Sequence, residues 1–441
     1  MVTDQHLANG AGPPSSARGA SGVINREASA ERPILIVSQY FWPEAFRVND
    51  LASELIARGH EVTVLTGLPN YPEGDVFPAY RADPQAFSTY EGASVVRVPM
   101  LARGRGHLRL ALNYLSFVLG GMLFGPLKLR GREFDAVVVF QTSPITAALP
   151  ALLLRRLKRA PVLMWVLDLW PETLSAVGVV KSPAVLAPIG ALVRFIYRRC
   201  DRILVQSRAF FANIALYSDE PGKVRYLPGW AEQVFQNEGV AAEPAPELAR
   251  LDGGFKVLFA GNVGEAQDFP AIVEAVDLLR NEPGLLIAIV GDGSAAKSTR
   301  EEIARRGLKE RVVFLGRFPL ERMPSFFAAA DALLVSLRDE PIWAMTIPGK
   351  VQSYLASGTP ILAMLNGEGA RVIEEAEAGL VAPAGDAATL AANVRRLMAM
   401  SAQQREALGA SGKAYSLREF DRATQITRLE QWIAELRPGD G

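Results

Sequence analysis

A glycine-rich turn in the second half of the chain has the composition of a phosphate-binding loop. Gly261, Asn262 and Gly264 follow the apolar run Lys256–Ala260 and precede a segment with helical periodicity. Glycines let backbone N–H groups approach an anion closely, and the first turn of a helix favours negative charge. The turn is therefore a candidate for binding the phosphates of a nucleotide, although an ordinary strand-to-helix turn uses the same residues.

A second turn of this kind follows the next apolar run. Gly291, Asp292 and Gly293 continue to Ala296 in a G-x-G-x-x-A pattern, which also occurs as a dinucleotide fingerprint. No clear acidic partner for a ribose follows at the expected distance. The pattern is compatible both with a nucleotide contact and with a purely structural turn.

Lys350 is the cation that we expect beside the phosphates. It lies at the start of a predicted helix that begins near Pro348. A lysine in the first turn of a helix opposes the helix dipole, and an anion bound there would offset this cost. The residue type and its position therefore favour an anion site.

Carboxylates in the first half of the chain are candidates for a role at the reacting groups. Glu44 opens the predicted helix Glu44–Arg58, where an acidic residue also favours helix initiation. Asp168 and Glu172 follow the apolar run Pro161–Val166, and Asp168 could instead cap the next helix. We expect Glu44, and one of the other two carboxylates, to face a cleft.

These residues occupy turns in a regular alternation of strands and helices. Continuous β-branched runs between helices indicate parallel strands buried on both faces. The predicted fold is α/β, with two Rossmann-like, doubly wound domains facing a cleft. The predicted strands are Pro33–Ser38, Glu61–Thr66, Ser94–Pro99, Asp135–Phe140, Pro161–Val166 and Asp201–Gln206 in the first half, and Lys256–Ala260, Leu285–Val290, Val312–Leu315, Ala332–Ser336 and Pro360–Ala363 in the second.

Composition along the chain predicts the domain boundaries. Residues 1–30 are rich in Gly, Ala, Ser and Pro and are expected to form a disordered tail. Residues 31–228 and 255–412 form the two domains, and the aperiodic residues 229–254 connect them. A helix within residues 413–441 is expected to return to the first domain. Because ligands of such sheets bind outside the carboxyl ends of the strands, the site is expected in the cleft.

The motifs, taken in order, resemble those of the retaining GT-B glycosyltransferases of family 4. The chain is most similar to bacterial enzymes that build colanic acid, capsule and O-antigen repeats, the fucosamine- and fucose-transferase-like proteins. The resemblance covers about Pro33 to Leu436. It rests on SQYFWPEAFRVNDLASELIARGHEVTVLTGLPNYPEG (38–74), DLWPE (168–172), FAGNVGEAQD (259–268), IVGDGS (289–294), FLGRFP (314–319) and IPGKVQSYLASGTPILA (347–363).

The resemblance implies roles for further residues of the second domain. The loop at Arg317 and Phe318 would hold the base, and Phe318 would either stack on it or belong to the core. The family commonly has two glutamates before its A-x-G-x-P motif, and both are missing here. Ser353 stands at the second position, where its hydroxyl could reach a ribose, and Glu340 could take over a sugar contact. Gln267 stands where the family often has an arginine or lysine.

The resemblance also implies a reaction. A sugar, an N-acetylated hexosamine or deoxyhexosamine, would move with retention from UDP to a polyprenyl-diphosphate-linked saccharide in cell-surface polysaccharide synthesis. Thr142 and its neighbours would lie near the reacting sugar, and no metal or other cofactor is expected. Two alternatives stay open: an enzyme like UDP-N-acetylglucosamine 2-epimerase, and a catalytically silent nucleotide-sugar-binding partner, which the missing glutamates favour.

The composition excludes several other classes of protein. Lys+Arg and Asp+Glu both number 47, so the chain has no global basic field for nucleic acid. The single cysteine, Cys200, excludes a disulfide framework and fits a reducing compartment. With three scattered histidines, no zinc site of ordinary ligands is expected.

One apolar segment suggests a membrane. Leu110–Leu127 contains no charge. Arg103, Arg105 and Arg109 precede it, and Lys128, Arg130 and Arg132 follow it. It is short and contains polar and glycine residues, which argues against a spanning helix. A buried core helix and a membrane-dipping helix with basic flanks are both compatible with the segment. We expect a cytoplasmic protein attached peripherally to the cytoplasmic face of the inner membrane.

Overall fold

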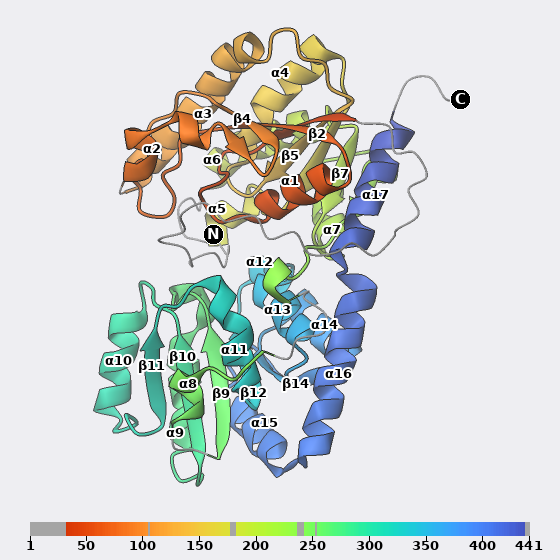
Figure 1. The fold of residues 1–441 in the computed structure, drawn as a ribbon. Helices are drawn as coiled ribbons and strands as arrows, with labels where there is room; N and C mark the ends of the chain where they lie inside the picture. The colour runs from red at the N-terminus through yellow and green to blue at the C-terminus, as the bar shows by residue number, and fades with distance from the viewer. Residues whose placement is uncertain (1–31, 105, 177–181, 236–241, 252–253, 437–441) are drawn as a thin grey trace.

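The computed structural model describes residues 32–104, 106–176, 182–235, 242–251 and 254–436. The predicted disordered tail, residues 1–30, lies outside the described residues, as does Arg105. The described residues form two α/β domains, one above the other in Figure 1, and the last two helices run alongside both. The prediction of two doubly wound α/β domains is confirmed.

The first domain is built on an eight-stranded sheet in the order β3-β4-β2-β1-β5-β6-β7-β8. Neighbouring strands are parallel, except that β3 runs antiparallel to β4. The short edge strands β3 and β8 were not predicted, because they lack a continuous apolar run. The strands are β1 (Pro33–Val37), β2 (Glu61–Thr66), β3 (Thr89–Tyr90), β4 (Ala93–Arg97), β5 (Ala136–Gln141), β6 (Val162–Val166), β7 (Arg202–Val205) and β8 (Val224–Tyr226).

Helices cover both faces of this sheet, which explains why its central strands are apolar throughout. α1 (Arg47–Ala57) and α17 (Arg422–Glu435) pack on one face. α3 (His107–Lys128), α4 (Leu149–Lys158) and α6 (Pro183–Tyr197) pack on the other. The shorter helices are α2 (Pro78–Ala82), α5 (Glu172–Ala176) and α7 (Phe210–Ala215).

The second domain has a six-stranded parallel sheet in the order β11-β10-β9-β12-β13-β14. The unpredicted strand β14 lies at its edge. The strands are β9 (Phe255–Ala260), β10 (Leu285–Val290), β11 (Val312–Gly316), β12 (Ala332–Ser336), β13 (Ile361–Met364) and β14 (Gly379–Ala382). The helices are α8 (Pro246–Ala249), α9 (Phe269–Leu278), α10 (Ala296–Arg305), α11 (Met323–Ala328), α12 (Pro341–Ala344), α13 (Gly349–Ser357), α14 (Glu368–Glu375) and α15 (Ala387–Ala399).

The end of the chain forms α16 (Ala402–Glu419) and α17. The prediction of a single helix over Ala387–Leu408 is wrong, because α15 ends at Ala399 and Ser401 caps a new helix, α16, by accepting a hydrogen bond from the N–H of Gln404 at 3.2 Å. The second predicted stretch, Leu417–Leu436, is likewise interrupted between α16 and α17. α17 then packs on the first domain, where its buried residues join the core around β1. The two domains are therefore tied at the chain terminus as well as by the connecting segment.

The connecting segment is anchored at both ends. Trp230 is buried against Trp165 of β6, with ring centroids 5.2 Å apart. Phe235 stacks on Phe327 of α11 at 5.1 Å, and α8 packs on the second domain. These contacts join aromatic side chains far apart in the sequence, so the aperiodic stretch gave no signal of them.

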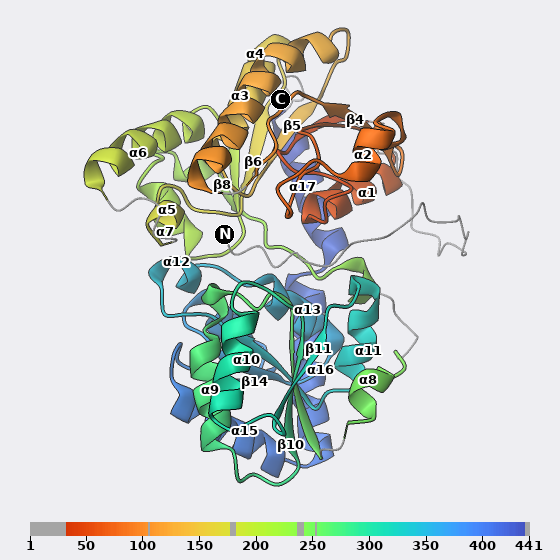
Figure 2. The same ribbon diagram turned by 90° about the vertical axis from the view of Figure 1, so that its left-hand side faces the viewer.

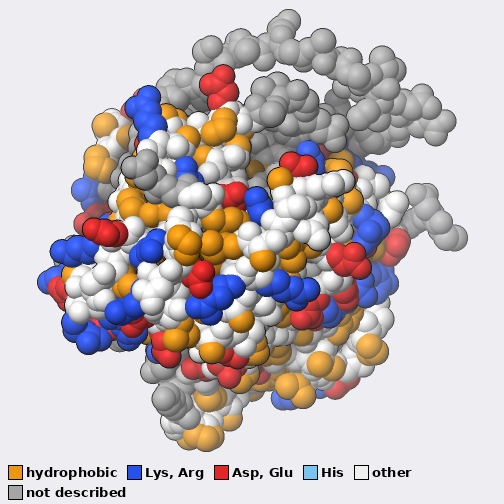
Figure 3. Space-filling model, turned by 90° about the horizontal axis from the view of Figure 1, so that it is seen from below, with side chains coloured by type: hydrophobic (Ala, Val, Ile, Leu, Met, Phe, Trp, Pro, Cys, Tyr) orange, Lys and Arg blue, Asp and Glu red, His pale blue; other side chains and the backbone are white. Residues whose placement is uncertain are grey.

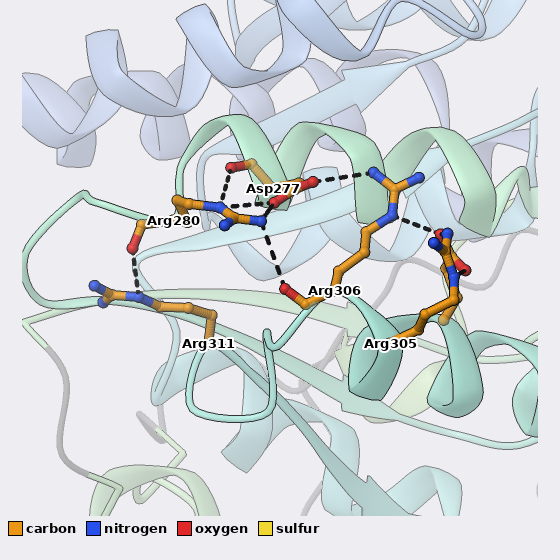
Figure 4. A network of polar contacts seen from close by, with 6 residues as sticks. Asp277, Arg280, Arg305, Arg306 and Arg311 are labelled. Carbon is orange, nitrogen blue, oxygen red and sulfur yellow. Dashed lines mark hydrogen bonds and ion pairs between the residues drawn. The ribbon is translucent and has the colours of Figure 1, made fainter.

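The surface of the molecule carries charges of both signs. Figure 3, a view from below, shows acidic and basic side chains mixed over that face, in keeping with the net charge of zero. One local network joins α9 to α10: Asp277 accepts from Arg306 at 3.2 Å and also pairs with Arg280 (Figure 4). Such exposed pairs contribute little stability each.

Candidate active site

A cavity of about 330 Å³ lies between α1 of the first domain and α11 and α13 of the second, at the carboxyl end of β9. The connecting segment forms part of its wall. Its position matches the predicted location of a ligand site at the carboxyl ends of the strands. Its lining includes Phe46, Arg47, Asn49, Asp50 and Tyr90, then Glu232, Gln233, Val234 and Phe235, and then Gly261, Asn262, Leu320, Glu321, Met323, Phe327, Gly349, Lys350, Ser353 and Tyr354.

Four of the residues that the sequence indicated meet at this cavity: Gly261, Asn262, Lys350 and Ser353. Lys350 is the second residue of α13 and is buried. Its ammonium lies 4.3 Å from the centroid of the Phe259 ring, an arrangement in which the aromatic face attracts the cation. A mostly desolvated cation at the start of a helix is thus held at the wall of the cavity.

Ser353 is joined to a carboxylate that the sequence did not indicate. Its hydroxyl donates a hydrogen bond of 2.5 Å to Oε2 of Glu232, which comes from the connecting segment. The hydroxyl also lies 3.2 Å from the carbonyl oxygen of Gly349 in its own helix. The carboxylate of Glu232 therefore lies beside Ser353 at the wall of the cavity.

Asp50 of α1 adds a second carboxylate to the same wall. Burial and the nearby charge of Glu232 raise the pKa of Asp50, Arg422 and Arg47 lower it, and the net result is a pKa of about 6. Asp50 and Arg47 lie three residues apart and so share a face of α1. The cavity thus combines two carboxylates with the cations of Arg47 and Lys350.

Arg47 links the two domains directly. Its guanidinium donates a hydrogen bond to Oε1 of Gln352 on α13. Gly229 lies against this contact, and a Cβ at that position would overlap the guanidinium. The sequence did not predict Arg47, because its partner belongs to the other domain.

The remaining wall of the cavity is aromatic. Phe327 stacks on Phe235 and meets Tyr354 edge to face, with ring centroids 5.2 Å apart. Phe318 does not belong to this wall. It packs against Phe326 at 4.7 Å, in agreement with the alternative that it is a core residue, and Arg317 is exposed next to Asp292 at 3.9 Å.

The glycine turns are shaped by contacts within the protein. Gly291 has φ +144°, and a Cβ there would lie 1.8 Å from the carbonyl oxygen of Gly261. The N–H of Gly291 donates to Gly316, and the N–H of Gly264 donates to the side chain of Gln267 at 3.1 Å. The second turn therefore packs tightly on the first.

Seven of the predicted donor residues lie outside the lining of the cavity, among them Gln267 and Glu340. Gln267 is buried, with its side-chain oxygen engaged by Gly264 and its carbonyl accepting from Ser336 at 2.6 Å. Glu340 is the N-cap of the short helix α12. The donor contacts expected of these two side chains therefore remain predictions, and the structure gives Gln267 a structural contact instead.

Glu44 differs from its prediction. The helix begins at Arg47 instead of Glu44, so the predicted helix start is wrong. The Glu44 carboxylate is buried and accepts from the N–H groups of Phe41, Asn70 and Tyr71 at 3.1, 2.8 and 2.7 Å. Burial raises the pKa of Glu44 to about 8, although these hydrogen bonds lower it. The side chain ties the loop after β1 to the loop after β2 and is not part of the cavity lining.

The other predicted residues of the first domain lie at the carboxyl ends of β5 and β6. Glu172 is the first residue of α5 and accepts from the hydroxyl of Tyr217 at 2.8 Å. Asp168 lies too far before α5 to cap it; burial raises its pKa, and a hydrogen bond with Ser143 lowers it. Thr142 is half-buried, and its carbonyl accepts from Gln141 at 2.6 Å. These three residues follow strands of the first sheet and do not belong to the lining of the cavity.

α3 contains the apolar segment singled out in the sequence and has two different faces. Asn113 on its inner face is buried and accepts from Gln39 at 2.8 Å. Gly120 and Gly121 let this face approach its neighbours, since a Cβ would lie 2.2 Å from the Pro99 carbonyl oxygen and 2.6 Å from Pro150. The outer face is exposed and apolar: Leu108, Leu112, Leu115, Leu119, Met122, Leu123, Phe124 and Leu127.

Among the described residues, α3 is the one helix long and apolar enough to cross a membrane, over Leu108–Lys128, and a third of that window is buried. The sequence left open a buried core helix and a membrane-dipping helix. Neither describes α3 fully, because its inner face packs in the core while its outer face is exposed. No group of three or more His, Cys, Asp or Glu in the described part of the chain could hold a metal ion.

Comparison with known proteins identifies relatives of both domains. Residues 254–400 match the family described as glycosyl transferases group 1, and residues 44–230 match the glycosyl transferase 4-like domain. A probable glycosyltransferase of Pseudomonas aeruginosa, WbjE, is 30% identical over 64% of this chain and 71% of its own length. The putative colanic acid biosynthesis glycosyl transferase WcaI of Escherichia coli K12 is 27% identical over 74% of this chain and 81% of its own.

Solved structures share the fold. Anabaena HepE, crystallised with UDP and glucose, superposes with a TM-score of 0.65 at 15% identity, covering 92% of this chain and all of HepE. WaaG, a glycosyltransferase of lipopolysaccharide biosynthesis, gives 0.60 at 17% identity, with 92% of this chain and all of WaaG covered. At these identities the likeness concerns the arrangement of two domains around a cleft.

Proposed function

The chain belongs to the family 4 glycosyltransferases of GT-B fold that act in bacterial polysaccharide biosynthesis, and we propose that it moves a sugar from a UDP-sugar to a polyprenyl-diphosphate-linked saccharide with retention. The observation that carries the donor part of the proposal is the cavity between the domains, where Lys350 and the Glu232–Ser353 pair face an aromatic wall. HepE, with the same fold, was crystallised with UDP and glucose.

The cavity offers a separate chemical group for each part of a nucleotide diphosphate. The aromatic wall of Phe235, Phe327 and Tyr354 suits a flat base, since aromatic rings bind one another by offset stacking. The carboxylate of Glu232 and the hydroxyl of Ser353 can accept from and donate to sugar hydroxyls. Lys350, at the start of α13, supplies positive charge for the diphosphate.

The chemical role of this arrangement is to stabilise the departing diphosphate. As the glycosidic bond breaks, negative charge develops on the phosphate oxygens, and a preorganised cation in a desolvated site lowers the energy of that state. Lys350 is such a cation. Retention of the anomeric configuration fits attack by the acceptor hydroxyl on the face of the sugar from which the phosphate leaves. Closure of the two domains would exclude water from the cavity.

The acceptor proposal is supported by α3. One helix contributes Asn113 to the edge of the first sheet and a row of exposed leucines to the surface. An acceptor with a polyprenyl tail would keep its lipid in the membrane while its saccharide reaches the cleft. The enzyme would then work at the cytoplasmic face of the membrane, where nucleotide sugars and lipid-linked intermediates meet.

A transfer assay tests this proposal. Labelled UDP-sugars are incubated with the enzyme and with synthetic polyprenyl-diphosphate saccharides, and the anomeric configuration of the product is read by NMR. Transfer with retention supports the proposal. Conversion of UDP-N-acetylglucosamine without acceptor would select an epimerase, and donor binding without turnover or slow hydrolysis would indicate a silent partner.

A further inference from the structure

We propose that α6 is a second membrane-contacting helix, which together with α3 forms a two-helix docking surface for an anionic lipid leaflet. We call the exposed apolar residues of the two helices the docking face: Leu108, Leu112, Leu115, Leu119, Leu123 and Leu127 of α3, and Val185 and Phe195 of α6. The inference rests on the proposed action at a membrane and names an element that the apolar segment of the sequence did not include.

The exposed side of α6 is apolar except for Arg194 in its last turn. Its first eleven residues, Pro183–Val193, contain no charged side chain, and its buried residues are limited to Gly190, Val193, Ile196 and Tyr197. Val185 remains 48% exposed, and Phe195 is also exposed. A helix on the surface of a water-soluble domain normally turns polar residues outward, whereas one that is apolar all round is covered by something.

α3 has the same unusual character on its outer side. Leu108, Leu112, Leu115 and Leu119 recur at intervals of three or four, so they form one stripe along the helix, and Leu115 is 54% exposed. On the inner face, Gly120, Gly121 and Asn113 each make close contacts with neighbouring parts of the domain. In the described part of the chain, the leucines of the stripe stay exposed.

The two helices lie on the same side of the first domain. Phe117 and Val118 of α3 are buried beneath the leucine stripe, and Phe117 belongs to the same core cluster as Val193 and Ile196 of α6. Figure 2 shows both helices on the face turned toward the viewer. Both helices therefore cover the same face of the first sheet.

The charges around the docking face match an anionic leaflet. Residues 101–132 contain six basic residues and no Asp or Glu, and residues 182–200 contain Arg194, Arg198 and Arg199 and no Asp or Glu. The guanidinium of Arg199 lies 3.6 Å from the centroid of the Phe195 ring, so a cation accompanies an exposed aromatic residue. One carboxylate, Asp219, pairs with Arg198 at 3.0 Å. Basic rims around apolar residues are typical of interfacial helices, and two copies of this face would repel each other.

Environment-sensitive labelling tests the proposal on the full-length enzyme. Cys200 is 4% exposed and burial raises the pKa of its thiol to about 12, so a cysteine introduced at the surface can be labelled selectively. Leu115→Cys and Val185→Cys probe the two helices. Leu417→Cys is the matched control, because Leu417 is 55% exposed on α16 of the second domain. Each variant carries a nitrobenzoxadiazole label and is mixed with vesicles of phosphatidylcholine with or without phosphatidylglycerol.

The expected result is a blue shift and a severalfold gain in fluorescence at positions 115 and 185 with the anionic vesicles, a smaller change with neutral vesicles, and no change at position 417. A change at 115 without one at 185 would overturn the role of α6. A change at 185 that depends on protein concentration without vesicles would indicate a second copy instead, and would also overturn it.

Sedimentation with vesicles provides a second readout. The variant Val185→Gln/Phe195→Gln is expected to bind anionic vesicles about tenfold more weakly than Leu278→Gln/Leu417→Gln, which changes exposed leucines of the second domain. Equal binding would contradict the proposal. Hydrolysis of the donor in the absence of vesicles distinguishes this failure from a failure of the proposed transferase function, since it needs no membrane.

Discussion

The hydroxyl of Ser353 donates a 2.5 Å hydrogen bond to Oε2 of Glu232, joining α13 of the second domain to the segment that connects the domains. Because of this contact, a carboxylate reaches the cavity at a place where the helix itself has none. The segment between the domains therefore takes part in the donor site, and its position depends on how the two domains are arranged.

Glu232→Gln is expected to weaken UDP binding by roughly 10-fold to 100-fold, because a hydrogen bond to a charged group is worth about 1.5–3 kcal/mol. Isothermal titration calorimetry with UDP measures the change. Glu274→Gln, which alters an exposed carboxylate on α9, is the matched control and should bind as the parent does. Equal affinity of the Glu232 variant would remove this residue from the donor site.

Lys350→Ala is expected to lower kcat by roughly 100-fold or more, since removing one preorganised charge-stabilising group typically has an effect of about that size. The control Lys297→Ala changes a lysine that is 90% exposed on α10 and should leave kcat unchanged. Steady-state kinetics with a UDP-sugar decide the matter. A variant with a normal kcat would show that Lys350 does not act on the leaving group.

Asp50→Asn is expected to stabilise the fold at neutral pH. Burial raises the pKa of Asp50 from 3.8 to about 6, so the folded state resists ionisation of a group that ionises readily once unfolded. Ionisation of Asp50 therefore lowers the free energy of unfolding. This loss is absent below about pH 4, grows as the pH rises to about 6, and stays constant above pH 6. The variant should therefore gain up to about 3 kcal/mol at pH 7.5 and nothing at pH 3.5.

Urea unfolding of the parent and the Asp50 variant at the two pH values measures this difference. A gain of the same size at both values would contradict the assignment, since it would come from a property of asparagine that does not depend on ionisation.

Gly291→Ala is expected to destabilise the second domain by about 3 kcal/mol or more, because its Cβ would lie 1.8 Å from the Gly261 carbonyl oxygen in a backbone conformation that side chains disfavour. Gly307→Ala has a positive φ but open space, and should cost about 1 kcal/mol. Urea unfolding compares the two. A stable Gly291 variant that has lost only donor affinity would favour phosphate binding over turn packing.

The sequence predicted the fold well because parallel strands buried on both faces are continuous apolar runs. It also placed Gly261, Asn262, Lys350 and Ser353 at one cavity, since they follow the carboxyl ends of strands or begin a helix beside them. The sequence did not predict Arg47, Asp50 or Glu232. Their partners belong to another domain or to an aperiodic segment, and no local pattern marks such contacts.

Three predicted site residues that lie outside the cavity lining make other contacts in the structure. Glu44 and Gln267 have the polarity of ligand-binding groups, but each engages backbone N–H groups of its own loops. Phe318 is a half-buried aromatic side chain that packs against Phe326 of the core, in line with the second of its two predicted roles. Polarity or aromaticity next to a strand end indicates a site only when the side chain is not already used to hold the turn.

Thermal unfolding in the presence of UDP, GDP, ADP, UMP and NAD tests the central claim, that the interdomain cavity binds the nucleotide of the donor. A ligand at a hundred times its dissociation constant adds about 2.7 kcal/mol to the stability of the folded state. UDP is expected to stabilise the protein, and this stabilisation should be weakened in Lys350→Ala and kept in Lys297→Ala. Absence of a response to every nucleotide, or a response to UDP that is undiminished in Lys350→Ala, would contradict it.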